Sequence, residues 1–127
     1  MCNGFLPVEL GRREDRMAHM TEILVVATIK LKDGKADEAI AGLTPIIEQV
    51  HQQDGCLSYA LHRDINDPNT LVFVERWESQ EALNDHVQQP HMAELAALAG
   101  TIAAEAPQIV FCESLAIGDS AKGVIGA

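Results

Sequence analysis

The residues best suited to chemistry lie close together in the segment FVERWESQEALNDHVQQPHM, positions 73 to 92. It contains the only tryptophan of the chain, Trp77, together with Glu75, His86 and His91. A histidine exchanges protons near neutral pH, a buried glutamate must be paired, protonated or close to water, and a tryptophan ring can hold a flat ligand. This combination indicates acid–base chemistry beside an aromatic surface. The structural alternative is a core tryptophan, with Glu75 at the rim of a strand and paired with an arginine.

Two adjacent strands would position these groups. Side chains two residues apart on a strand share a face, and one such set on the strand over 70–78 is Phe73, Glu75 and Trp77. On the preceding strand, Tyr59 and Arg63 share one face and His62 lies on the other. Periodicity does not say which set faces the helices. His62 and His86 are therefore both candidates for a general base, and Tyr59 is a candidate for a ring that holds a ligand.

The spacing of the candidate groups argues against a metal site. His86 and His91 are five residues apart with Pro90 between them, which is not the HExxH spacing and does not complete a two-histidine, one-carboxylate site. The patterns GxGxxG, GxxxxGKS/T and GxSxG are all absent. We therefore predict a site without a metal ion, nucleotide or flavin. Cys56 is either an inert, half-buried cysteine or a reactive thiol.

Composition restricts the class of protein. The chain has 127 residues, of which 47% are apolar and 22% charged, which is typical of one globular domain. Its net charge of −10 opposes binding to nucleic acid or to an anionic membrane surface. Three cysteines without a paired spacing fit a reducing compartment, and no apolar run resembles a signal peptide or a membrane span. We therefore expect a cytoplasmic protein that binds neither nucleic acid nor membrane.

The hydrophobic pattern predicts an α+β fold with the element order β-α-β-β-α-β. Strands are expected over 22–32, 56–65, 70–78 and 108–117, and helices over 35–55 and 80–106. Gly55 would end the first helix, Ser79 would cap the second, and Pro90 would either begin a further helical segment or separate two. Residues 66–69 would form the turn between the central strands. Right-handed crossovers fold this order into a ferredoxin-like antiparallel sheet with the helices on one face.

Both faces of this sheet are expected to be apolar. On the first strand, Leu24 and Val26 point to one side, while Val25 and Ala27 point to the other. The helices can cover only one of these faces. A second subunit is the simplest cover for the other, and two sheets packed in this way would make a homodimeric α+β barrel.

Two segments resemble the antibiotic biosynthesis monooxygenase (ABM) domain family, and in particular its quinol monooxygenase branch. The segments are DGCLSYALHRD at 54–64 and VERWESQEALNDHVQQPHM at 74–92, and the matching residues are Asp54, Gly55, Tyr59, Glu75, Trp77, Ala82, Leu83, His86, Pro90 and His91. The resemblance covers about residues 21–117, so we expect a mobile extension at residues 1–20 and a flexible tail at residues 118–127. Ala27 stands where haem-degrading members carry an asparagine, which disfavours that branch.

The resemblance implies a homodimer that oxygenates a small quinol or phenol with O₂ and uses no flavin, haem or metal. It implies catalytic roles for His86, His62, Trp77 and Tyr59, and substrate-binding roles for Glu75, Arg63, His91 and Phe73. One of the two catalytic histidines would take a proton, and Arg63 or His91 would steady the oxyanion that results. Two other functions remain open: a dimeric module that binds an aromatic metabolite without turnover, and an isomerase of a small signalling metabolite.

Overall fold

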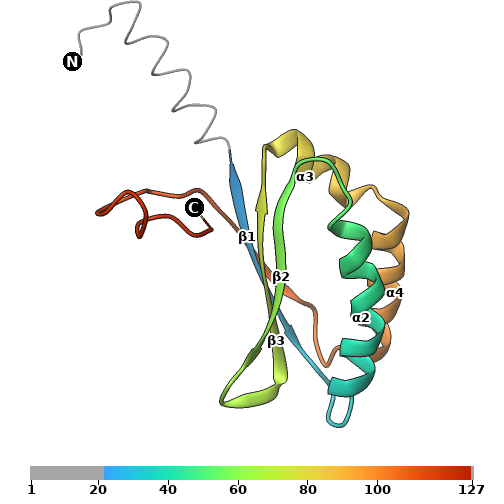
Figure 1. Cartoon of the computed structure of the whole chain (residues 1–127). Helices are drawn as coiled ribbons and strands as arrows, with labels where there is room; N and C mark the ends of the chain where they lie inside the picture. Colours follow the sequence, from blue (N-terminus) through green and yellow to red (C-terminus); the bar gives the residue numbers. More distant parts are fainter. Residues whose placement is uncertain (1–21, 127) are drawn as a thin grey trace, which may run out of the picture.

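The computed structural model describes residues 22–126, so the extension expected at residues 1–20 lies outside the described residues (Figure 1). Its elements are β1 Ile23–Lys30, α2 Ala36–Val50, β2 Cys56–Asp64, β3 Asp67–Trp77, α3 Gln80–Val87, α4 Pro90–Ile102 and β4 Gln108–Cys112. The predicted order β-α-β-β-α-β is confirmed, with its second helical region divided into α3 and α4.

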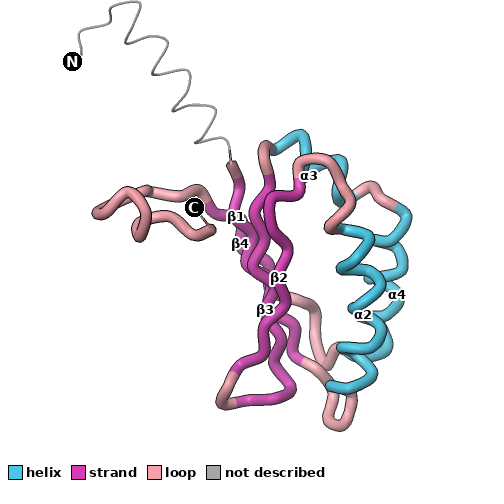
Figure 2. The backbone as a smooth tube through the Cα atoms, viewed as in Figure 1, coloured by secondary structure: helices cyan, strands magenta, loops and turns pink. Residues whose placement is uncertain are grey.

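The four strands form one antiparallel sheet in the order β2-β3-β1-β4. All three helices lie on one face of it, which Figure 2 shows as a cyan layer beside the magenta strands. This is the ferredoxin-like α+β fold that the sequence pattern predicts. The sheet is the rigid layer on which the candidate side chains are mounted, and α3 and α4 bring the histidines over it.

Local chemistry sets the ends of the helices. Ser79 caps α3, because its hydroxyl oxygen accepts the backbone N–H of Ala82 at 3.1 Å. Pro90 occupies the first turn of α4, where its missing N–H costs no hydrogen bond. The helix expected to reach Gly55 already ends at Val50, and residues 51–55 form turns.

Gly55 joins these turns to the sheet. Its φ of +84° lies in the left-handed region, and a Cβ there would stand 2.5 Å from the Cβ of Ala82. Its carbonyl oxygen accepts the backbone N–H of Glu78 at 2.8 Å. Glycine therefore allows the turn before β2 to pack directly against the beginning of α3.

Two strand boundaries differ from the prediction by three residues or more. The β2–β3 pairing continues to Asp64 and Asp67, so the hairpin turn is residues 65–66 and the expected turn at 66–69 is wrong. The Asp67 carboxylate accepts the backbone N–H of Asn69 at 3.0 Å and the hydroxyl of Thr70 at 2.7 Å, which orders the start of β3. The last strand ends at Cys112 and not at residue 117, because its partner β1 begins at Ile23 and the pairing with β4 ends at Leu24.

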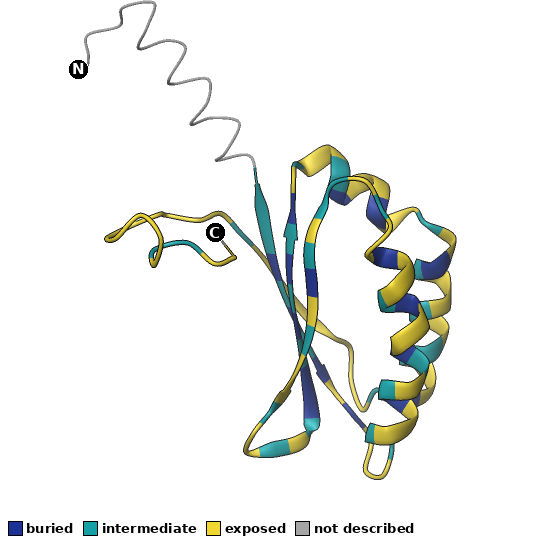
Figure 3. Cartoon of the chain, in the orientation of Figure 1, coloured by how far each residue is buried: buried dark blue, intermediate teal, exposed yellow. Residues whose placement is uncertain are grey.

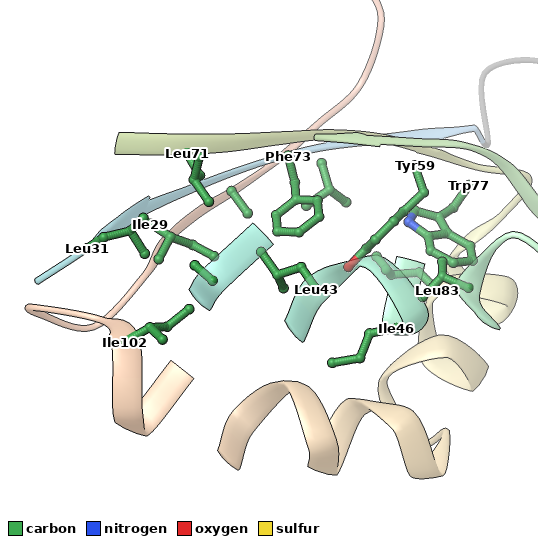
Figure 4. Packing of buried hydrophobic residues seen from close by; sticks show 14 residues of the cluster. Ile29, Leu31, Leu43, Ile46, Tyr59, Leu71, Phe73, Trp77, Leu83 and Ile102 are labelled. Atoms are coloured by element: carbon green, nitrogen blue, oxygen red, sulfur yellow. The ribbon is translucent and has the colours of Figure 1, made fainter. Parts of the chain in front are cut away.

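The hydrophobic core fills the space between the sheet and the helices. Figure 4 shows Leu71, Phe73, Tyr59 and Trp77 pointing from the strands towards Leu43 and Ile46 of α2. The largest of the fully buried side chains is Trp77, at 0% exposure, which fixes the end of β3 against the helices. The ring that we predicted for ligand contact is therefore first an anchor of the core.

The other face of the sheet is apolar and has no helix over it. Val26, Val74 and Val110 lie next to one another across β1, β3 and β4, and Val110 is 56% exposed. On the opposite face, residues of the strands are buried against the helices, and Figure 3 shows the buried residues in dark blue. Both faces of the sheet are therefore apolar, as the sequence indicates. The second subunit that is expected to cover the outer face stays a prediction.

The residues after β4 leave the sheet on the side away from the helices (Figure 1). Near the end of the described chain they return to the sheet, where Arg76 donates to the carbonyl oxygen of Gly126 at 2.9 Å and also pairs with Glu22. Arg76 thereby holds this segment on the outer face. The flexibility that we expect of residues 118–127 stays a prediction.

Candidate functional site

The site is built on one row of residues that crosses the sheet. Strand register places Tyr59 beside Glu75, Glu75 beside Val25, and Val25 beside Phe111. All four side chains point towards the helices, because they alternate with residues of the outer face. The next row continues through Phe73, so an aromatic and apolar surface adjoins the two polar groups.

A cavity of about 130 Å³ lies between this surface and the helices. The sheet contributes Val25, Ala27, Ile29, Tyr59, Phe73, Glu75, Ile109 and Phe111, while the helices and the following loop contribute Leu83, His86, Val87, Met92, Leu95, Ala99 and Pro107. Only three of these side chains, those of Tyr59, Glu75 and His86, carry a titratable group. The cavity is therefore apolar except for these three groups, Tyr59 and Glu75 on the sheet and His86 on α3, which we call the polar row.

The exposed part of the cavity wall lies at the edge strand β4 and at Val87 of α3, which is 57% exposed. Ile109 and Phe111 line the cavity and are also 52% and 62% exposed, whereas Glu75 and His86 are 6% and 3% exposed. A ligand that enters past these two apolar side chains would leave water and meet the polar row at the inner end. This arrangement suits a largely apolar ligand with a polar end group.

Glu75 is a buried carboxyl with one hydrogen-bond donor. The indole Nε1–H of Trp77 donates to its Oε1 at 2.9 Å, and within residues 22–126 its other oxygen has no hydrogen-bond partner. No lysine or arginine pairs with it among the described residues. Burial raises the pKa of Glu75 to about 7, although the Trp77 hydrogen bond acts in the opposite direction. Glu75 can therefore gain or lose a proton near neutral pH.

His86 lies against Trp77 and is held from behind by Gln53. Its ring centroid is 4.3 Å from that of Trp77, with an angle of 33° between the planes. Its Nδ1 is 2.9 Å from the amide oxygen Oε1 of Gln53. Burial, and to a lesser extent the charge of His91, lowers the pKa of His86 to about 4. His86 is therefore neutral at pH 7.

Gln53 also joins the second histidine to the site. The Nε2 of His91 lies 2.9 Å from the same Oε1 of Gln53. An amide oxygen only accepts, so both imidazoles donate an N–H to it. For the neutral ring of His86 this places the proton on Nδ1 and leaves the lone pair on Nε2.

Gln53 and His91 face a different hollow from the one that His86 faces. Both line an open, polar groove of about 830 Å³ between the end of α2 and the α3–α4 junction. The His86–Gln53–His91 connection thus separates the apolar cavity from a groove exposed to solvent. Sequence reasoning missed Gln53, because nothing in HQQDG distinguishes its second glutamine from the first.

Tyr59 completes the polar row. Its ring centroid is 5.0 Å from that of Phe73 and 5.7 Å from that of His86. Burial raises the pKa of Tyr59, and the charges of Glu75 and Cys56 add to this, so its hydroxyl stays protonated. Figure 4 shows this hydroxyl directed away from the sheet, and within residues 22–126 it makes no hydrogen bond, which leaves it available to a ligand oxygen.

Cys56 lies at the margin of the site. Burial and the charge of Glu75 raise the pKa of its thiol, which reduces its thiolate fraction and hence its reactivity. The structure therefore favours the inert alternative for Cys56.

Six of the eight predicted site residues lie together, namely Tyr59, Phe73, Glu75, Trp77, His86 and His91. The other two do not join them. His62 is exposed on the outer face, where its Nδ1 lies 3.4 Å from the carbonyl oxygen of Val72. Arg63 pairs with Leu71 at the far end of β2 and is exposed. The alternation of side chains along the strand shows that His62 and Tyr59 lie on opposite faces of the sheet. It does not show which of the two residues faces the helices.

Two further properties concern the described part of the chain. No three histidine, cysteine, aspartate or glutamate side chains within residues 22–126 are grouped so that they could hold a metal ion. No helix in that range has the length and hydrophobicity needed to cross a membrane. The absence of a metal or cofactor from the reaction stays a prediction.

Comparison with known proteins places the chain in a family. The sequence profile described as "Antibiotic biosynthesis monooxygenase" matches residues 22–98, which include Tyr59, Glu75 and His86. The chain therefore belongs to the antibiotic biosynthesis monooxygenase family, as its motifs indicate.

Individual relatives are distant. The chain is 36% identical over 72 residues to "Uncharacterized protein sll1783" of Synechocystis, over 57% of this chain, and it spans about half (49%) of that relative. It is 29% identical over 80 residues to "Probable quinol monooxygenase YgiN" of Escherichia coli K12, over 55% of this chain and 77% of that protein. The crystal structure of PA3566 from Pseudomonas aeruginosa matches with a TM-score of 0.70 and 26% identity, over 76% of this chain and 98% of the other.

Proposed function

We propose that this protein is a cofactor-independent monooxygenase that oxidises a small quinol or phenol with O₂. The observation that carries the proposal is the apolar cavity of about 130 Å³ that holds Tyr59, Glu75 and His86 at one row. Membership of the monooxygenase family and the likeness to a protein named as a quinol monooxygenase support it.

The cavity suits a ligand of about one aromatic ring. Its volume of about 130 Å³ is close to that of an engineered apolar protein cavity, about 150 Å³, which stays dry and binds benzene. The rings of Phe73 and Tyr59 would contact the faces or edges of such a ligand. A hydroxyl group on the ligand would satisfy polar atoms of the site that lack a protein partner, which favours a phenol over a plain hydrocarbon.

The reaction requires only groups that the cavity contains. Removing a proton from a quinol hydroxyl makes the ring electron-rich enough to reduce O₂. A bond then forms between a ring carbon and oxygen, and the resulting hydroperoxide loses water. One oxygen atom stays on the ring and the other leaves as water, and the substrate itself supplies the electrons and protons for that water. The protein contributes a base, an oriented substrate and a dry site.

The positions of the predicted site residues bear on two roles, that of the base and that of the group that stabilises the oxyanion. His62 lies on the outer face, outside the cavity, whereas His86 lines it. Arg63 lies away from the polar row, so it is not positioned to steady an oxyanion there. Tyr59 has a protonated hydroxyl within the cavity and is better placed for this purpose.

The proposal includes a homodimer in the cytoplasm. The uncovered apolar face at Val26, Val74 and Val110 supports a second copy, because a soluble sheet with two apolar faces needs a cover on each. In this assembly the sheets pack face to face and each subunit keeps its own cavity.

Oxygen uptake tests the activity. Metal-stripped, flavin-free protein is incubated with reduced one-ring and two-ring quinols, each against its own autoxidation rate. Uptake well above background with a one-ring quinol supports the proposal. Binding seen as a change in Trp77 fluorescence, without uptake from any quinol, would replace it with the non-enzymatic binding module. Loss or rearrangement of a small dicarbonyl without uptake would point to the isomerase.

A further inference from the structure

We infer that the carboxylate of Glu75 is the group that takes the hydroxyl proton of the substrate. The inference rests on the proposed function and adds to it a catalytic residue that we first placed among the substrate-binding groups. It depends on where the carboxyl lies, on its hydrogen bonds and on the fixed proton of His86.

Glu75 is the sole carboxyl among the side chains that line the cavity. It is 6% exposed, and no cation neutralises it among the described residues. A buried carboxyl without a cation is costly to keep in a core, and a glutamine there would satisfy Trp77 equally well. The cost is explained if the carboxyl exchanges a proton with a ligand.

The hydrogen bond from Trp77 orients Glu75 for this purpose. The bond uses Oε1, at 2.9 Å, and leaves the second oxygen without a partner within residues 22–126. One oxygen is thus fixed, while the other can accept a hydrogen bond from a hydroxyl group in the cavity. Proton transfer to this oxygen needs no movement of the backbone.

His86 is fixed as a neutral hydrogen-bond acceptor. Gln53 takes the proton side of the ring, Nδ1–H, and Trp77 covers one face of it. The remaining Nε2 can accept a hydrogen bond from a hydroxyl. With a pKa of about 4, His86 binds a full proton far less readily than Glu75, whose pKa is about 7.

The groups around Glu75 do not add a competing cation. From β2 it is faced by Tyr59 and Cys56, whose own pKa values are raised, and from α3 by the neutral His86. β1, β4 and α4 contribute only apolar side chains to the cavity. His91 of α4 contacts Gln53 and lines the outer groove instead. Titration near neutral pH in this cavity therefore belongs to Glu75.

The proton can be followed through the reaction. The carboxylate removes the hydroxyl proton, and the electrons of that O–H bond remain on the substrate as the quinolate. After a ring carbon bonds to O₂, the carboxylic acid returns its proton to the peroxide, giving a hydroperoxide. Returning this proton restores the carboxylate for the next substrate. The hydroperoxide then loses water, formed from its outer OH group and the hydrogen on the same ring carbon, and a carbonyl oxygen stays on the ring.

The test is the pH dependence of oxygen uptake with methylhydroquinone by the full chain. Between pH 5 and 9, kcat/KM is expected to rise with a midpoint near the Glu75 pKa of about 7. Glu75→Gln, which keeps an acceptor for Trp77, is expected to lose about 100-fold or more, the usual contribution of a general base. The matched control is Glu78→Gln, at the exposed residue that follows β3, which should retain the wild-type profile.

Two results of this experiment would contradict the inference. If Glu75→Gln keeps wild-type kcat/KM while His86→Asn loses it, the proton goes to His86 and the inference is wrong. A profile that is flat between pH 5 and 9 would also overturn it, because a base with the pKa of His86, about 4, is already deprotonated throughout that range.

A binding measurement separates this inference from the proposed function. 4-Nitrophenol, a one-ring phenol that O₂ does not oxidise, is added above pH 7, and the carboxyl C=O stretch of Glu75 is followed by infrared difference spectroscopy. The protonated band is expected in the wild type and absent in Glu75→Gln. This band without oxygen uptake from any quinol supports the proton acceptor and rejects the monooxygenase. If the protein consumes oxygen, the carboxyl band does not appear and Glu75→Gln keeps its activity, the monooxygenase is supported and Glu75 is rejected as the proton acceptor.

Discussion

The indole nitrogen of Trp77 donates a hydrogen bond to the carboxylate of Glu75, two residues earlier on the same strand, at 2.9 Å. Both side chains face the helices because the strand alternates, and both are buried. The tryptophan that anchors the core thus also orients the carboxyl of the cavity. A Glu-x-Trp sequence on a strand is the shortest arrangement that combines these tasks.

Replacing Trp77 with Phe should raise the pKa of Glu75 above about 7, because the indole N–H favours the charged carboxylate. A hydrogen bond to a charged group contributes about 1.5 to 3 kcal/mol, so the loss of stability should be greater at pH 9 than at pH 5. Infrared titration of the carboxyl band measures the pKa directly. Phe73→Leu is the control, since it changes an adjacent ring and leaves the hydrogen bond in place. An unchanged titration in Trp77→Phe would show that the bond does not act on Glu75.

Stability should depend on pH through Glu75 in a direction opposite to that of an ordinary ion-paired carboxylate. The folded pKa is about 7 and the reference value is 4.5, so the folded state binds more protons than the unfolded state between these values. Stability therefore falls as pH rises from 4.5 to 7, by about 3 kcal/mol for this group. Glu75→Gln lacks this dependence.

Urea unfolding at several pH values measures the difference. The free energy of unfolding of Glu75→Gln minus that of the wild type should increase by about 3 kcal/mol between pH 4.5 and pH 7. Taking this difference removes the contribution of His86, whose lowered pKa of about 4 acts in the opposite sense below its reference value of 6.5. A constant difference would mean that Glu75 has an ordinary pKa in the folded protein.

Gln53 should control which nitrogen of His86 carries the proton. Its amide oxygen accepts from Nδ1, so the wild type is expected to show the Nδ1–H form in ¹⁵N NMR of the imidazoles. Gln53→Leu removes the acceptor and should produce a mixture of the two neutral forms. Gln53→Glu keeps the acceptor, adds a negative charge and should raise the pKa of His86 above about 4. Gln52→Leu, in the same turn, is the matched control, and an Nε2–H wild type would contradict the assignment.

Much of the fold and part of the site follow from sequence because they depend on local patterns. Period-two alternation places Phe73, Glu75 and Trp77 on one face, and the cap at Ser79 starts the helix that carries His86. Which face meets the helices depends on packing across the whole sheet, so the sequence could not say whether Tyr59 or His62 lies in the cavity. The strand ends at residues 67 and 112 depend on the length of the partner strands, which no local pattern states.

Gln53 was beyond sequence reasoning for a different reason. It acts through one amide oxygen shared by side chains that are 33 and 38 residues away along the chain. Its neighbour Gln52 has the same side chain and lies in the same turn, yet makes no hydrogen bond to either histidine. A role of this kind comes from tertiary geometry alone.

Filling the cavity should weaken ligand binding and leave the polar row intact. Ala99 of α4 lines the cavity, and Ala97 on the same helix is exposed. Ala99→Leu is expected to reduce the affinity for a one-ring phenol at least about tenfold, equivalent to about 1.4 kcal/mol. Ala97→Leu has the same helix propensity and should bind normally. Calorimetric titration with 4-nitrophenol compares the two, and equal affinities would place the ligand outside this cavity.

A charge on the uncovered face should dissociate the proposed dimer. Val74 lies at the centre of this face, between its neighbours Val26 on β1 and Ala60 on β2. Val74→Glu would bury an unpaired carboxylate in a face-to-face interface, which costs several kcal/mol, while in a monomer the same side chain would be solvated. Sedimentation velocity should therefore show a dimer for the wild type and a monomer for Val74→Glu. Leu57, which is 46% exposed on the edge strand β2, gives the control Leu57→Glu, which should stay dimeric. A wild type that sediments as a monomer at all concentrations would remove the dimer from the proposed function without affecting the cavity.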